Sequence, residues 1–195
     1  MEIIINELRE GNFVVLAGGP QSGKSSTSLE LAAEILVYKQ KGVAIFNLEM
    51  SKDWCTKRLV CSDAFTDKDG LVIENLYVDD TPAITVEKIR EKCIELKEKY
   101  DLGLVVIDYF QLLESKKVVD TQEEKYDYIS STLKKLAQEL NVCILILSQL
   151  KKQKDRKNAA LDDFNLSPYL SRDADMVFSL HKCKNDSKIL GLKPI

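Results

Sequence analysis

The most informative segment of this sequence is Gly18-Gly19-Pro20-Gln21-Ser22-Gly23-Lys24-Ser25. It fits the pattern of a glycine, four residues, and then Gly-Lys-Ser or Gly-Lys-Thr. Glycines let the backbone point several amide hydrogens into one concavity, where phosphate oxygens can sit. A helix that follows such a loop presents its positive N-terminal end to the same anion. The segment therefore predicts a phosphate-binding loop.

The residues on both sides of the loop provide the context that a chance glycine-rich turn would lack. Residues 12–17 are a short apolar run, which predicts a buried strand. A helix is predicted from about residue 24 to residue 40, with Gly42 ending it. In a strand–loop–helix unit of this kind, Lys24 neutralises the outer phosphates and the Ser25 hydroxyl ligates magnesium. We expect residues 18–26, including Ser26, to bind Mg²⁺-ATP.

Strand and helix signals alternate along the rest of the chain. Further apolar runs predict strands at residues 43–48, 76–78, 103–107, 142–147 and 176–180, the last of these being the final strand. Helices are predicted between them, with Ser51 as one cap and a capping box formed by Thr121 and Glu124. Strands that are apolar on both faces and separated by helices imply an α/β fold, with a parallel sheet covered on both sides.

The bulk composition sets limits on function. The 195 residues suit one domain spanning residues 1–195, with 45% hydrophobic and 30% charged residues. Because the net charge is −3, any surface that binds phosphate must be local. The polar stretch 151–172 is too long for an ordinary connection, and loops of that length are usually functional.

The cysteines, the histidine and the N-terminus indicate a cytoplasmic protein. Five widely spaced cysteines predict reduced thiols rather than a disulfide framework. His181 and Cys183 offer only two ligands, which is too few for a metal site. The charged N-terminus is unlike a signal peptide, and no uncharged apolar run approaches the ~20 residues that span a bilayer. We therefore expect no membrane association.

Three polar residues at the ends of predicted strands complete the candidate site. Asp108 ends an apolar run and would face the crevice where parallel sheets bind ligands, holding magnesium there, although many strands end in a turn aspartate. Glu49 follows the strand at 43–48 and could polarise an attacking water. It could equally be a solvated carboxylate that starts a helix. Gln149 follows the strand at 142–147 and could sense the terminal phosphate, or be a simple turn residue.

Several segments together resemble the ATPase domain of DnaB-type replicative helicases, which have a RecA-like fold. They are residues 11–17, Asn47-Leu48-Glu49-Met50 with Arg58 downstream, Ile107-Asp108-Tyr109-Phe110-Gln111-Leu112, residues 136–142, Leu147-Ser148-Gln149-Leu150 and Asp173-Ala174-Asp175. They occur in the family's order and cover most of residues 8–180. The resemblance implies a three-layer RecA-like P-loop fold, with a mainly parallel central sheet whose core order is 5-1-4-3-2.

The resemblance also implies roles for individual residues. Lys24, Glu49 and Gln149 would be catalytic, with Glu49 as the base and Gln149 coupling the nucleotide state to loops that bind DNA. Ser25 and Asp108 would serve magnesium. The two loops would be residues 113–122 and 150–172. The second carries basic residues that could contact single-stranded DNA or be an ordinary solvated turn. These are Lys151, Lys152, Lys154, Arg156 and Lys157.

At the level of the assembly, the resemblance implies a homohexameric ring that moves 5′–3′ along single-stranded DNA and contacts other replication proteins. The family's arginine finger, which acts on the neighbouring subunit, would be replaced by lysine, with Lys182 and Lys184 as candidates. Lysine lacks the planar fork of arginine, so hydrolysis in trans could be weaker. We expect no N-terminal collar domain, and a closing hairpin after residue 180 that is reduced or missing.

Four hypotheses remain on the sequence alone. The first is an ATPase and translocase stimulated by DNA. The second is a nucleotide-switched binding module that does not unwind DNA, as the shortened ends favour. The third, a signalling ATPase of the KaiC group, shares the fold but matches the Leu-Glu-Met and Ser-Gln-Leu segments less well. The fourth, a small-molecule kinase, needs a lid and an acceptor pocket that the sequence does not show.

Overall fold

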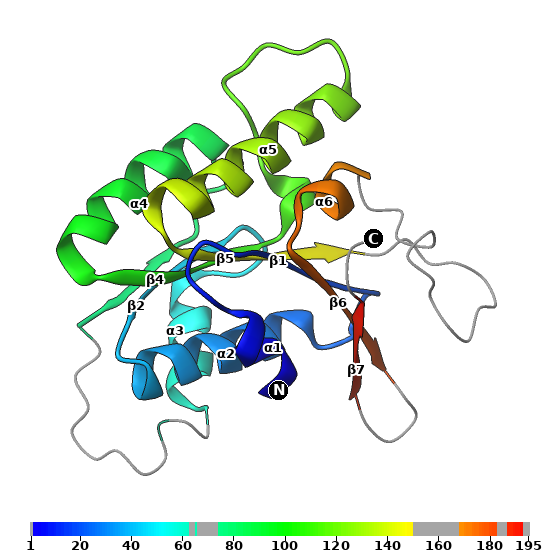
Figure 1. Ribbon diagram of the computed structural model, residues 1–195. Helices are drawn as coiled ribbons and strands as arrows, with labels where there is room; N and C mark the ends of the chain where they lie inside the picture. The colour runs from blue at the N-terminus through cyan, green and yellow to red at the C-terminus, as the bar shows by residue number, and fades with distance from the viewer. Residues whose placement is uncertain (1, 63–64, 66–73, 150–167, 183–186, 193–195) are drawn as a thin grey trace.

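The computed structural model describes residues 2–62, 65, 74–149, 168–182 and 187–192 (Figure 1). Its strands are β1 (Phe13–Gly18), β2 (Gly42–Asn47), β3 (Leu76–Asp79), β4 (Leu102–Asp108), β5 (Cys143–Gln149), β6 (Met176–Lys182) and β7 (Ser187–Leu192). Its helices are α1 (Glu2–Glu7), α2 (Lys24–Tyr38), α3 (Lys52–Val60), α4 (Val86–Tyr100), the short 3₁₀ helix η2 (Phe110–Leu112), α5 (Gln122–Leu140) and α6 (Pro168–Asp173).

The described strands form one sheet in the order β3-β2-β4-β5-β1-β6-β7. All neighbours pair in parallel except β6 and β7, which are antiparallel. If the short strand β3 and the antiparallel β7 are left out, the five strands β2, β4, β5, β1 and β6 remain as the core of the sheet. Read from β6, and with these five numbered along the chain, their order is 5-1-4-3-2. The predicted core order is therefore confirmed.

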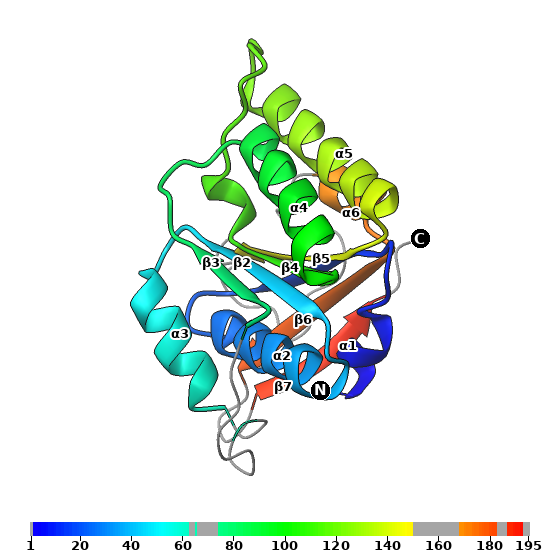
Figure 2. The same ribbon diagram turned by 90° about the vertical axis from the view of Figure 1, so that its left-hand side faces the viewer.

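Helices cover both faces of this sheet. Helices α4, α5 and α6 lie on one face, and α1, α2 and α3 lie on the other (Figures 1 and 2). Alternate residues of β1 pack against the helices on opposite faces of the sheet, since successive side chains of a strand point to opposite faces. Phe13 and Val15 pack with α4 and α5, whereas Val14 and Leu16 pack with α1 and α2. This arrangement confirms the three-layer α/β fold.

The connection from α2 to β2 differs from the sequence prediction. Helix α2 ends at Tyr38, Gln40 takes the left-handed backbone conformation with a φ of 54°, and Gly42 is the first residue of β2. Gly42 does not end the helix. It is needed because a Cβ at this position would lie 2.6 Å from the carbonyl oxygen of Tyr100. Close approach of two backbones explains the glycine here.

We expect Gly42→Ala to lower the free energy of unfolding by about 1–3 kcal/mol, because the backbone at Tyr100 must shift to admit the methyl group. Urea unfolding of the variant measures this loss. The matched control is Gly19→Ala, where an added Cβ meets no atom within 4 Å. Equal losses for the two variants would show that steric contact is not the reason for Gly42.

Two elements near the C-terminus correct the sequence prediction. The strand at 176–180 is not the last, because β7 pairs with β6 from Val177↔Leu192 to Lys182↔Ser187. A hairpin is therefore present where a reduced or missing one was expected. In addition, α6 begins at Pro168, within the stretch predicted as loop 150–172, and continues to Asp173. Proline is favoured in the first turn of a helix, where its missing N–H has no partner to lose, and Pro168 occupies that place.

The paired aspartates before β6 have structural contacts. Asp173 accepts a hydrogen bond from the Ser130 hydroxyl at 2.7 Å, which joins α6 to α5. Asp175 accepts one from the backbone N–H of Phe13, also at 2.7 Å, and so holds the start of β1. These bonds help to set the positions of β1 and β6 beside each other. Strand β1 leads directly into the predicted phosphate-binding loop.

The structure also shows the state of the described cysteines and whether the described residues could form a metal cluster or a membrane-spanning helix. Cys55, Cys61, Cys93 and Cys143 are free cysteines, and the first, third and fourth of these are buried. Within the described ranges no group of three or more histidine, cysteine or acidic residues could hold a metal ion. No described helix combines the length and the apolar character needed to cross a membrane.

Candidate nucleotide-binding site

A cavity of about 340 Å³ lies where β1, β2, β4 and β5 end. Parallel strands bring their carboxyl ends to one edge of the sheet, which is where such folds bind ligands. The lining residues come from the predicted loop and from the ends of three other strands. They are Pro20, Gln21, Ser22, Gly23, Lys24, Ser25, Ser26, Glu49, Asp108, Tyr109 and Gln149. The structure thus gathers the loop and the three strand-end residues that the sequence singled out.

Gly18 and Gly19, also predicted to bind nucleotide, lie at the base of the loop rather than in the cavity lining. Their carbonyl oxygens each accept a hydrogen bond from Lys24 Nζ at 2.8 Å. A Cβ on Gly18 would lie 2.5 Å from Ser22 Oγ and 2.9 Å from the carbonyl oxygen of Leu180. Gly23 has a φ of 93°, a left-handed conformation that favours glycine, and stands directly before α2. The glycines therefore shape the loop around Lys24.

The start of α2 faces the same loop. This helix has 15 residues and no side-chain cap at its N-terminus. The first amide hydrogens of a helix lack partners within it and carry the positive end of its dipole. An anion in the loop would satisfy them. The local structure is therefore suited to phosphate.

Lys24 is buried, with 8% of its surface exposed. Burial lowers the pKa of its ammonium group, while the carboxylates of Asp108 and Glu49 oppose that shift. Burying a charge is costly unless it is paired. Phosphate oxygens would add negative charge beside Lys24 and favour its charged form.

Asp108 is the most deeply buried acid of the cavity, at 3% exposed, and its Oδ2 has no hydrogen-bond partner among the described residues. Burial is the main cause that raises the pKa of this carboxyl. The Ser25 hydroxyl lowers that pKa, and the charge of Glu49 raises it. A free carboxylate oxygen beside a hydroxyl is an oxygen donor set of the kind that magnesium prefers. The residues present therefore fit the ion.

Asn47 sets the turn that carries Glu49, and sequence reasoning missed it. Asn47 Oδ1 accepts hydrogen bonds from the backbone N–H of Glu49 at 3.0 Å and of Met50 at 2.8 Å. The N–H of Leu48 donates to the carbonyl of Asp108 at 2.7 Å, which ties this turn to β4. The signal was available, since asparagine commonly forms such turns with the backbone two residues ahead.

Two further residues border the site. Tyr109, which follows Asp108, lines the cavity. Arg58 of α3 donates a hydrogen bond to Ser26 Oγ at 3.4 Å and so brings a second cation to the edge of the predicted phosphate-binding loop. The sequence alone pointed to Arg58 only through the resemblance to DnaB-type helicases. Its contact with α2 depends on how α3 packs beside α2 (Figure 2).

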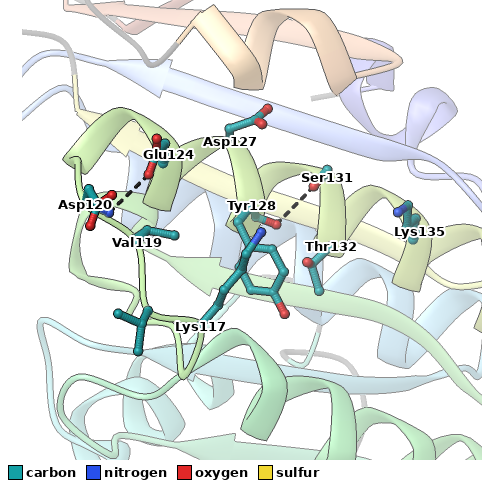
Figure 3. Close-up of a pocket in the computed structure, with 10 residues that line it drawn as sticks. Lys117, Val119, Asp120, Glu124, Asp127, Tyr128, Ser131, Thr132 and Lys135 are labelled. Carbon is teal, nitrogen blue, oxygen red and sulfur yellow. Dashed lines mark hydrogen bonds between the residues drawn. The ribbon is translucent and has the colours of Figure 1, made fainter.

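The first predicted DNA loop, residues 113–122, borders a second cavity of about 470 Å³. Lys117 lies over the Tyr128 ring of α5, with 4.8 Å between its nitrogen and the ring centre (Figure 3). In this loop Val118 is 92% exposed. The lining residues carry both charges. Lys117 and Lys135 are basic, whereas Asp120, Glu124 and Asp127 are acidic.

Most of the other residues predicted to bind DNA or to act on a neighbouring subunit lie outside the residues that the structure describes. The five basic residues at 151, 152, 154, 156 and 157 lie outside the described residues, as does Lys184. Lys182 is the last residue of β6. These assignments stay predictions.

The family model for the DnaB-like helicase C terminal domain matches residues 1–189 of this chain. Among curated relatives, the replicative DNA helicase DnaC of Bacillus subtilis is 31% identical over 198 residues, covering 89% of this chain and 44% of the relative. The replicative DNA helicase DnaB of Geobacillus stearothermophilus is 32% identical, with the same coverage of 89% and 44%. The chain thus spans just under half the length of these two relatives.

Solved structures agree with this match. A DnaB-like replicative helicase, studied with its interactions with primase, gives a TM-score of 0.80 at 26% identity, covering 95% of this chain and 53% of that one. A separately solved ATPase domain gives a TM-score of 0.81 at 28% identity, covering 95% and 78%. A KaiC-like protein of Pyrococcus horikoshii gives 0.66 at 15% identity over 95% of this chain and 80% of that one, a likeness of fold alone.

Proposed function

This chain belongs to the family of DnaB-like helicase C-terminal domains, and from that premise we propose that it binds Mg²⁺-ATP in the 340 Å³ cavity and hydrolyses it. The observation that supports this most is the cavity itself. Lys24, Ser25, Glu49, Asp108 and Gln149 come from four separate segments of the chain and line one space. A volume above about 300 Å³ is typical of sites for small ligands.

The proposed mechanism assigns one task to each group. Backbone amides of the loop and of the start of α2 bind the phosphates, and Lys24 neutralises their outer charge. Ser25 and Asp108 would hold magnesium, which when bound neutralises charge on the β- and γ-phosphates. Glu49 orients a water molecule and accepts its proton as the water oxygen bonds to the γ-phosphorus. The bond from that phosphorus to the β-phosphate oxygen breaks, releasing ADP and phosphate.

We further propose that hydrolysis is coupled to single-stranded DNA through Gln149 and the segments that follow β4 and β5. Gln149 ends β5, and residues 150–167 continue directly from it. The curated relatives are named replicative DNA helicases, which supports a role in replication. By the same family resemblance the working form is a cytoplasmic homohexameric ring that moves 5′–3′ and contacts other replication proteins.

Steady-state ATP turnover, measured with and without single-stranded DNA, tests the proposal. We expect turnover to require magnesium and to rise severalfold with single-stranded DNA. The rise should shrink as salt increases, because phosphate contacts release counterions. Turnover at background in both conditions, together with intact nucleotide binding, would instead favour a nucleotide-switched module. The hairpin of β6 and β7 removes one reason for that alternative, which relied partly on a reduced C-terminal end.

Two further measurements address the finer parts of the proposal. Light scattering after size-exclusion chromatography, with and without nucleotide, reports whether a hexamer forms. Forked DNA substrates that offer only a 5′ or only a 3′ tail report the direction of movement. A monomer under all conditions, or unwinding from the 3′ tail, would contradict these parts and leave ATP hydrolysis untouched.

A further inference from the structure

Three buried side-chain oxygens have no hydrogen-bond partner among the described residues: Ser22 Oγ, Asp108 Oδ2 and Gln111 Oε1. Ser22 and Asp108 line the nucleotide cavity, so bound phosphate and magnesium would account for their free oxygens. Gln111 is not among the residues that line that cavity, and the proposed mechanism does not use it. Its free oxygen therefore needs another explanation.

Gln111 connects the ends of two strands. It lies in η2, three residues after Asp108, the last residue of β4. Its Nε2 donates to Ser148 Oγ at 2.8 Å and to the carbonyl oxygen of Gln149 at 3.2 Å. A carbonyl oxygen can only accept, so the bond to Gln149 also settles which amide atom of Gln111 is the nitrogen. Both partners are at the end of β5.

The pairing of the strands shows why this bond matters. The ladder between β4 and β5 ends at Ile107↔Ile146. Strand β5 runs on to Gln149 and is held there on its other side by β1, through Gly18↔Gln149. On the side of β4, the Gln111 side chain bonds the last carbonyl of β5 beyond the end of the ladder. It therefore takes the place of a strand–strand hydrogen bond next to Gln149.

The element that carries Gln111 is firmly anchored. Phe110 is 1% exposed, and its ring centre lies 5.0 Å from that of Tyr126 in α5. Leu113 is fully buried, and its N–H donates to the carbonyl of Phe110 at 3.1 Å. Side chains packed in this way resist displacement. A movement of the end of β5 would therefore strain the hydrogen bonds of Gln111 and, through η2, act on the backbone next to Asp108.

A purely space-filling role does not account for the amide. An unpartnered buried polar atom costs about 1–3 kcal/mol, and methionine has a similar length without that cost. The amide is explained if its nitrogen holds the carbonyl of Gln149 and its oxygen can accept a bond when the end of β5 rearranges. Both features concern the strand end that bears the candidate phosphate sensor.

We propose that Gln111 is a positioning residue for Gln149. It holds the backbone of Gln149 so that this side chain lines the nucleotide cavity, and it joins the sensing end of β5 to the acidic end of β4. This inference rests on the proposed nucleotide site and adds a residue that acts through Gln149 rather than touching the reacting atoms.

The test compares Gln111→Met with the parent chain. We expect the Kd for ADP to change less than about twofold, because the loop that binds the phosphates is untouched. Without the two hydrogen bonds we expect kcat for ATP hydrolysis to fall about tenfold, the effect of roughly 1.4 kcal/mol in the barrier. The ratio of ATP to ADP affinity should approach that of Gln149→Ala. The matched control is Gln138→Met on the exposed side of α5, with all three quantities unchanged.

A double mutant separates positioning from general stability. If Gln111 acts through Gln149, the kcat of the double mutant Gln111→Met/Gln149→Ala should equal that of Gln149→Ala alone, because coupled residues are not additive. A merely structural role would lower the melting temperature and multiply the two losses. Losses of kcat that multiply in the double mutant, or a wild-type kcat in Gln111→Met, would overturn the inference.

A second variant keeps the test decisive if Gln111→Met does not fold. Gln111→Glu keeps the shape but replaces the donor to Gln149 with an acceptor. We expect a loss of kcat at least as large as that for methionine, and a wild-type kcat would refute the role of this hydrogen bond. The proposed function fails separately, and visibly, if the unmodified chain shows no Mg²⁺-dependent ATP binding.

Discussion

Lys24→Ala is expected to raise the Kd for Mg²⁺-ATP by up to about 100-fold, to the edge of detection. Lys24 Nζ sits at the base of the loop on the carbonyls of Gly18 and Gly19, and its charge is buried beside Asp108. A hydrogen bond to a charged group contributes up to about 3 kcal/mol, and each 1.4 kcal/mol is tenfold in affinity. Isothermal titration calorimetry with ATP and magnesium measures the change.

The control for this variant is Lys41→Ala. Lys41 is paired with Glu10 and Asp101 at the surface, away from the cavity, so its removal should leave the Kd for ATP as it was. Retention of full affinity in Lys24→Ala would contradict the assignment of the loop as the phosphate site. It would remove the premise on which the roles of Glu49, Asp108 and Gln149 depend.

Glu49→Gln is expected to lower kcat for ATP hydrolysis by about 10²–10⁴-fold, the usual contribution of a general base, with nucleotide binding retained. The amide has the shape of the carboxylate but cannot accept the proton of the attacking water. Single-turnover hydrolysis after rapid mixing, with the Kd measured in parallel, separates chemistry from binding.

The same variant has a second effect that gives an independent readout. The charge of Glu49 is one of the causes that raise the pKa of Asp108. Neutralising Glu49 removes that cause, so Asp108 should lose its proton at a lower pH and magnesium-dependent binding should extend to more acidic conditions. Glu30→Gln, on the exposed side of α2, is the control and should change neither quantity. Unchanged turnover in Glu49→Gln would exclude it as the base.

The structure explains why the role of Glu49 stayed open on the sequence alone. A carboxylate between a strand and a helix can start the helix or face the sheet edge. Ser51 is the residue that caps α3, accepting from the N–H of Trp54, and α3 begins at Lys52. Glu49 stands before that cap on a turn held by Asn47, and it lines the cavity. The direction of its side chain depends on that turn.

The elements missed in the sequence share a physical cause. Strand β7 has six residues, including a glycine, and forms by pairing with β6. Helix α6 is also six residues long and is held by bonds from α5 such as that of Ser130 to Asp173. Short elements carry too few residues for a periodic signal, and their stability comes from tertiary contacts. The hydrogen bonds from Gln111 to the end of β5 could not be predicted either, because they join residues that lie 37 and 38 positions apart in the sequence.

Local patterns in the chain were enough to predict the buried parallel strands, which the structure confirms, and to single out the candidate phosphate-binding loop and the acids at the strand ends. Glycine spacing, apolar runs and residues at strand ends are properties of neighbouring positions. Folding decided which of those ends meet, because the shared cavity exists only once β1, β2, β4 and β5 lie side by side. The buried environments of Lys24 and Asp108, the tie from the Asn47 turn to β4 and the bridge at Gln111 follow from contacts between residues far apart in the sequence, which no local pattern encodes.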